Sequence, residues 1–257
     1  MDFGMRSILA IARYTFLQQF RNRLYLVVVL FGLLMVAASL LFGALAGDQE
    51  VRVILDLGLV TAEVFGLATA VFGAVTLVVE EMESKTIYLI LTRPIPRPVY
   101  VLGRFLGLLL AVVASMTVME LLHFSLLFLK GWKPDPAVFA ALPMMGLKIM
   151  VMTALSLLCS LTFTSAPTAS VFSILFWVLG HFGSELRYMA EKSGAAAKVL
   201  VEILCALLPN LTLLNARDLI EMPGFGFAPL LHGAAYAVLY TAACLALSSA
   251  LFSKKEF

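Results

Sequence analysis

The sequence predicts an all-α polytopic membrane protein with six transmembrane helices in a single domain, residues 1–257. Hydrophobic residues make up 62% of the chain and charged residues only 13%, about half the charged share of a typical soluble domain. Several apolar segments reach about 20 residues, the length that crosses a bilayer as a helix. The predicted spans lie at about 24–46, 57–79, 99–129, 138–163, 169–185 and 228–252.

Composition and motifs argue against several other classes. The basic residues are spread along the chain, with a net charge of +2, so no nucleic acid is expected as a partner. Cys159, Cys205 and Cys244 are scattered and give no metal or disulfide framework. The sequence has no phosphate-binding GxxxxGK[ST] loop and no HExxH or GxSxG motif. We therefore expect a chain without a catalytic site, a metal or a cofactor of its own.

The N-terminal residues 5–20 predict an amphipathic helix that lies at the membrane interface. Apolar residues recur there at helical spacing, while Arg6 and Arg13 lie on another face. Arg21 and Arg23 then mark the start of the first span. The loop expected between the first two spans carries four charged residues: Asp48, Glu50, Arg52 and Asp56.

Residues 80–107 lie between two spans and have a different character. Their apolar core, residues 86–92, would be about 10 Å long as a helix, too short to cross a bilayer. A short apolar helix between charged flanks needs a cover, and a groove on another protein is the natural one. Three prolines then prevent a continuous helix: Pro94, Pro96 and Pro98.

The order of residues in this segment resembles the ABC-2 type permease family, the membrane subunits of type-2 ABC exporters. In that family an acidic pair, a Gly-Thr, a Leu-rich helix, a Pro, an Arg and a Gly-Lys follow the second membrane helix. Lys85 stands here at the glycine position and Arg104 at the lysine position. The matching residues are Glu81, Glu83, Thr86, Ile87, Leu89, Ile90, Leu91, Pro94, Arg97, Gly103 and Arg104.

The resemblance implies that residues 83–93 form a cytoplasmic coupling helix, which binds separate ATPase subunits that carry ATP and Mg. A second permease copy or a paralogue would complete the translocation pathway, and an external accessory protein is a further expected partner. The resemblance also implies the cytoplasmic (inner) membrane of a bacterium or archaeon. The residues expected at the ATPase contact are Glu81, Glu83, Thr86, Ile87, Tyr88, Ile90, Leu91, Arg93, Pro94, Arg97 and Arg104.

The second half of the chain contains one long segment that is not a span. Residues 186–227 are mixed in polarity, and residues 195–208 predict a helix of about 21 Å that ends at Pro209. We interpret this helix as re-entrant or external, between the fifth and sixth spans. More Lys and Arg residues flank the membrane on the side that holds both termini and residues 80–107, which places that side in the cytoplasm.

Charged residues inside the predicted spans suggest a buried polar pair. Glu120 and His123 share one face of the third span, and Lys148 lies in the fourth. The third and fourth spans are joined by a short loop, so they should be antiparallel neighbours. Glu120 and Lys148 then reach a similar depth. Because an unpaired charge at that depth is costly, we expect the two to face each other or to share a polar pocket, with His123 one turn away. The alternative is that each points separately into a wet pathway.

Three other functions fit the sequence less well. A mechanotransmission subunit would use the same ATPases to act on an external partner. A membrane-embedded enzyme would need Glu120, His123, His181 or Glu185 to converge, and these lie at different depths. A secondary transporter would show repeated broken helices.

Overall fold

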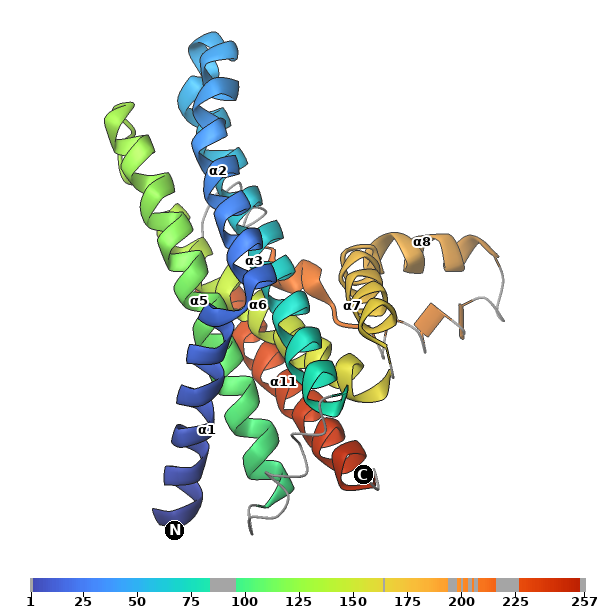
Figure 1. The fold of residues 1–257 in the computed structure, drawn as a ribbon. Coiled ribbons are helices and arrows are strands. Elements are labelled where there is room, and N and C mark those ends of the chain that lie inside the picture. Colours follow the sequence, from blue (N-terminus) through green and yellow to red (C-terminus); the bar gives the residue numbers. More distant parts are fainter. Residues whose placement is uncertain are drawn as a thin grey trace.

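The computed structural model describes residues 2–83, 96–163, 165–193, 198–199, 201–202, 205, 208–215 and 227–254. The regular structure in these ranges is helical (Figure 1). The helices are α1 (Asp2–Arg21), α2 (Arg23–Leu45), α3 (Glu50–Glu83), α5 (Arg97–Leu129), α6 (Pro136–Thr162), α7 (Ala166–His181), α8 (Gly183–Ser193) and α11 (Phe227–Lys254), with two 3-10 turns, η1 (Gly47–Gln49) and η2 (Leu211–Leu214).

Within the described residues, five helices are long and apolar enough to cross a membrane. These helices fit the predicted polytopic membrane protein, with five candidate spans in place of six. The segments are Tyr25–Leu45, Gly47–Val78, Arg97–Leu129, Val138–Thr162 and Leu230–Ser253.

The prediction of a loop between the first two spans is wrong, because this part of the chain is almost entirely helical. The chain turns at Gly47, whose φ of +58° suits a residue without a Cβ. η1 and the first turns of α3 follow at once, since no proline interrupts residues 48–57. The charges are tolerated at this end of the helix, where Glu50 forms a 2.6 Å ion pair with Lys130 at the end of α5.

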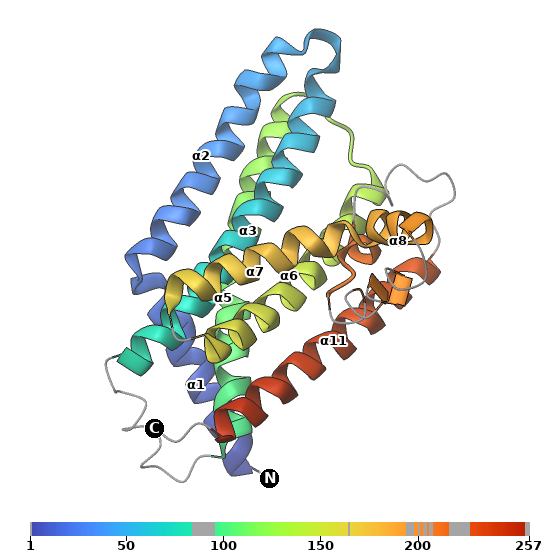
Figure 2. The same cartoon turned by 90° about the vertical axis from the view of Figure 1, so that its right-hand side faces the viewer.

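The predicted fifth span is also corrected, because α7 ends at His181 and not near residue 185. With 16 residues it is about 24 Å long, short of a bilayer crossing. Figure 1 shows α7 almost end-on, and Figure 2 shows that it is strongly inclined to α3. α8 then projects away from the bundle (Figure 1).

The segment after α8 returns to the bundle at η2. Leu211 and Leu214 are fully buried, and η2 contacts α6, α7 and α11. The Asn210 backbone N–H donates to the Tyr236 hydroxyl of α11 over 2.6 Å. This insertion follows the predicted helix 195–208, and the re-entrant position of that helix stays a prediction. The described residues 198, 199, 201, 202 and 205 are helical, whereas residue 208 lies in a bend. The rest of the predicted helix 195–208 lies outside the described residues.

The core of the bundle contains an antiparallel seam between α3 and α5. Three glycines on one face of α3 each accept a side chain of α5 so closely that an added Cβ would lie within 3 Å of it. The partners of successive glycines come in reverse order along α5, and the two series have the same total length, as antiparallel packing requires. The pairs are Gly58 with His123, Gly66 with Met116 and Gly73 with Leu108.

The predicted interface helix forms as α1, and it packs along the first half of α5 (Figure 1). An added Cβ at Gly107 would lie 2.3 Å from the Ala12 carbonyl oxygen, and one at Gly103 would lie 2.7 Å from Cβ of Ile11. Two glycines four residues apart let helix backbones approach closely. α1 is therefore held by the protein itself and not only by a membrane surface.

Candidate functional site

The predicted ATPase-contact residues are only partly placed by the structure. Glu81 and Glu83 lie in the last turn of α3. Arg97 and Arg104 lie in the first turns of α5. The others lie outside the described residues: Thr86, Ile87, Tyr88, Ile90, Leu91, Arg93 and Pro94.

Arg97 ties the start of α5 to the end of α11. Its Nη1 donates to the carbonyl oxygens of Phe252 and Ser253, over 2.5 and 2.7 Å. The last carbonyls of a helix lack partners within the helix and carry partial negative charge, so a guanidinium stabilises that end. These contacts lie within the chain, and a contact between Arg97 and an ATPase stays a prediction.

Arg104 is buried between α1 and α5, with 1% of its surface exposed. Its Nη1 donates to Thr15 Oγ1 and Gln18 Oε1, both over 3.0 Å, and its Nε donates to the Tyr100 hydroxyl over 3.2 Å. A contact between Arg104 and an ATPase also stays a prediction, and it would require α1 to leave α5. In this structure the guanidinium holds α1 in place.

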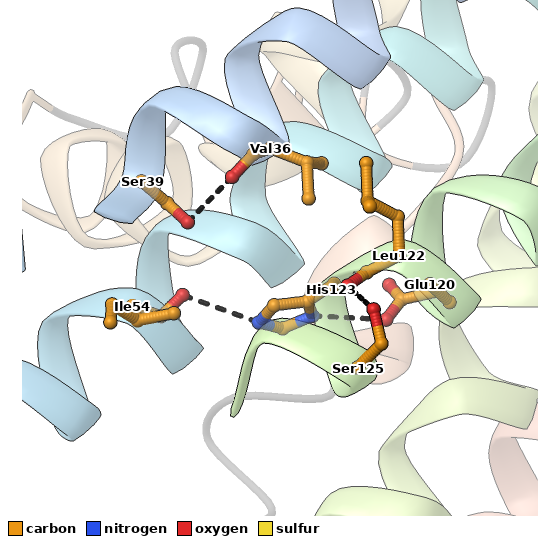
Figure 3. Close-up of polar contacts among 7 residues, drawn as sticks. All are labelled: Val36, Ser39, Ile54, Glu120, Leu122, His123 and Ser125. Atoms are coloured by element: carbon orange, nitrogen blue, oxygen red, sulfur yellow. Dashed lines mark hydrogen bonds and ion pairs between the residues drawn. The ribbon is translucent and has the colours of Figure 1, made fainter. Parts of the chain in front are cut away.

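Glu120 and His123 form a polar pair in α5 that reaches α3 (Figure 3). The His123 ring is fully buried, with Nδ1 3.2 Å from Glu120 Oε2 and Nε2 3.2 Å from the Ile54 carbonyl oxygen. The ring lies over Gly58, where an added Cβ would come within 2.1 Å of Nε2. The predicted proximity of Glu120 and His123 is confirmed, and the contact with α3 is an addition.

The atoms around the His123 ring indicate which ring nitrogen donates a hydrogen bond. Both atoms that face the imidazole ring are oxygens, and the Ile54 carbonyl can only accept. His123 Nε2 is therefore the donor in its contact with the Ile54 carbonyl oxygen. Glu120 Oε1 is buried without a hydrogen-bond partner in the part of the chain that the structure describes.

Lys148 pairs with Glu63, and the expected pairing with Glu120 is wrong. Lys148 Nζ donates to Glu63 Oε1 over 2.5 Å. His181 Nε2 lies 3.9 Å from the same oxygen, and His181 Nδ1 donates to the Trp177 carbonyl oxygen over 2.8 Å. The cluster therefore joins α3, α6 and α7, at the middle of the candidate spans of α3 and α6.

The missed residue, Glu63, had a signal in the sequence. It is the only charged residue in the predicted span 57–79. An intramembrane acid is costly unless it is paired, so an intramembrane lysine was its natural partner. The pairing with Glu120 relied on depth alone, although α6 packs more extensively against α3 than against α5.

Comparison with protein-family models and with curated proteins finds no match to this chain. The expected relation to ABC-2 type permeases therefore depends on the residue pattern between residues 81 and 104. Any function drawn from that relation is a proposal.

Proposed function

We propose that the chain is the membrane-spanning subunit of an ATP-driven ABC transporter of the ABC-2 type. In this proposal two copies, or one copy and a paralogue, form the pathway, and separate ATPases bind the coupling segment, residues 83–93. The observation that carries the proposal is the position of the family-like pattern, which joins the ends of the two core helices α3 and α5.

The shape of these two helices supports the proposal. α3 has 34 residues and α5 has 33, so each is about 50 Å long. The glycine seam packs them closely along their length. A close-packed helix pair moves as a body when it is pushed at one end. A push from an ATPase on the connecting segment would therefore reach the polar residues deep in the bundle.

The other functions receive less support. An enzyme would need its acids and bases in one place, whereas His123 pairs with Glu120 and His181 lies near Glu63. A subunit that acts on an external partner shares the same coupling segment, and the test below does not depend on which of the two it is.

Replacement of Ile87 or Leu91 with Asp tests the proposal. Each change adds a charge to the apolar surface that would enter an ATPase groove, so the chain should insert and fold but lose the ATPase when purified in detergent. Leu129→Asp is the control, because this residue is 84% exposed at the opposite end of α5. Retention of full ATPase association and full stimulation of hydrolysis in both coupling variants would refute the proposal.

A further inference from the structure

The cluster of Glu63, Lys148 and His181 differs from an ordinary buried ion pair in its surroundings. Only 2% of the Lys148 side chain is exposed, against 17% for Glu63 and 25% for His181. The cluster lies at the middle of two candidate spans. The exposed parts of Glu63 and His181 must therefore face lipid tails, water or another protein surface.

Contact with lipid tails is unfavourable in free energy for these ionisable side chains. Ionisable groups inside membranes almost always face the bundle interior or a water-filled cavity. The apolar neighbours behave as lipid-facing residues should, since Val64 is 41% exposed and Val178 37% exposed. On α3, the polar side at Glu63 is therefore distinct from the apolar side at Val64, at the same depth.

The hydrogen-bonding capacity of the cluster is also only partly used. Among the described residues, the Lys148 ammonium has one acceptor, Glu63 Oε1, although an ammonium has three N–H donors. His181 donates through Nδ1, so the neutral ring offers the lone pair of Nε2. Glu63 Oε2 is a second acceptor. The cluster can thus bind a group that both donates and accepts hydrogen bonds.

We propose that Glu63, Lys148 and His181 form a polar site in the wall of a water-filled pathway. The site binds an uncharged hydrogen-bonding group of a solute, and water in its absence, because the carboxylate and the ammonium already neutralise each other. The part of this inference that concerns a transported solute rests on the proposed transporter function, whereas the presence of water does not.

A cavity lined by sequence neighbours of His181 can also hold water. A cavity of about 90 Å³ lies at the junction of α7 and α8, with Gly180, Gly183 and Asn210 in its lining. This volume can hold several water molecules, and Arg187, Asn210 and Thr212 place polar groups in the lining that can bind them. Gly180 and Gly183 flank His181 on either side in the sequence.

Labelling of introduced cysteines with a hydrophilic thiol reagent tests the wet surface. The background has Cys159, Cys205 and Cys244 replaced by Ser, and the membranes are open, so the reagent reaches both sides. His181→Cys leaves the Glu63–Lys148 pair intact and is compared with Val178→Cys, one turn away on α7. Because thiolate forms in water and not in lipid, we expect His181→Cys to react at least about tenfold faster, although Val178 is the more exposed residue. Equal rates would overturn the inference.

A second pair of positions repeats the test on α3. Glu63→Cys, with Lys148→Met to avoid a stranded charge, is compared with Val64→Cys at the same depth.

The proposal that the ligand is uncharged is tested by labelling His181→Cys with two reagents of opposite charge. Their rate ratio should stay within about threefold of the ratio for free cysteine, whereas a bias above about tenfold would show a charged site. Labelling needs no ATPase, so the inference and the transporter proposal can fail separately.

Discussion

Gly58→Ala is a sensitive test of the contact between α3 and α5. In an unobstructed helix, alanine is more stable than glycine by about 0.5–1 kcal/mol. At Gly58, however, the added methyl group would lie 2.1 Å from His123 Nε2. The ring would have to leave its place between Glu120 and the Ile54 carbonyl. The sign of the effect therefore depends on whether this ring position is required.

The expected result is a net loss of stability. Overpacking of a close-packed core costs about 1–3 kcal/mol, and two lost hydrogen bonds cost about 1 kcal/mol each. After the gain in helix propensity, the free energy of unfolding should fall by about 2–4 kcal/mol. The measurement is denaturant or thermal unfolding of the purified chain in detergent, with Gly58→Ala and the unchanged chain side by side.

Two controls make the result specific. Gly146 lies inside α6, and an added Cβ there meets nothing within 4 Å, so Gly146→Ala should be neutral or stabilise by up to about 1 kcal/mol. In a His123→Ala background the obstruction is gone, and Gly58→Ala should then also be harmless. If Gly58→Ala is as stable as Gly146→Ala, the seam described for α3 and α5 is wrong.

Two further predictions concern the other contacts of the bundle. Glu63→Gln or Lys148→Met alone should lower the free energy of unfolding by about 3–5 kcal/mol and the double change by much less, whereas Lys148→Met should show no coupling to Glu120→Gln in a double-mutant cycle. Gly107→Ala would bring a methyl group against a backbone oxygen of α1, so α1 should become sensitive to limited proteolysis. Gly4→Ala, where an added Cβ meets nothing within 4 Å, should leave the cleavage of α1 unchanged. Equal cleavage of the two variants would show that the position of α1 does not depend on the contact at Gly107.

The sequence predicted the long helices well, because the length and the apolar composition of a segment define such a helix. The prediction failed at the ends of helices. The charged residues 48–56 read as a loop, yet charges are compatible with the first turns of a helix that meet solvent or an ion-pair partner. The predicted fifth span ran past His181, because sequence polarity did not reveal the break at Phe182 between α7 and α8.

At the polar sites, the sequence predicted a contact within one helix but not a contact between helices. The i,i+3 spacing predicted the Glu120–His123 contact, since both residues lie on one helix face. The partner of Lys148 depends on how α6 rotates about its axis and on which helix it packs against, which residue depth does not contain. Arg104 matched a family motif, yet the spacing of Gly103 and Gly107 was a more direct signal, because two small residues four apart favour close helix packing.

The position of the polar groups on α3 gives the proposed function a mechanical consequence. The His123–Ile54 hydrogen bond fixes α3 near one end, and the coupling segment follows Glu83 at the other. Glu63 lies about 13 Å from Ile54 and about 30 Å from Glu83 along the helix. If α3 tilts about Ile54, a push of about 3 Å at Glu83 moves Glu63 by about 1 Å. That displacement is enough to lengthen the 2.5 Å contact with Lys148 to the limit of a hydrogen bond. Toward His181, now 3.9 Å away, the same displacement brings the Glu63 carboxylate nearer to Nε2, which has no proton to donate while the ring is neutral and Nδ1 donates to Trp177. Loss of the Glu63–Lys148 contact is therefore the change that an ATPase-driven tilt of α3 would produce first.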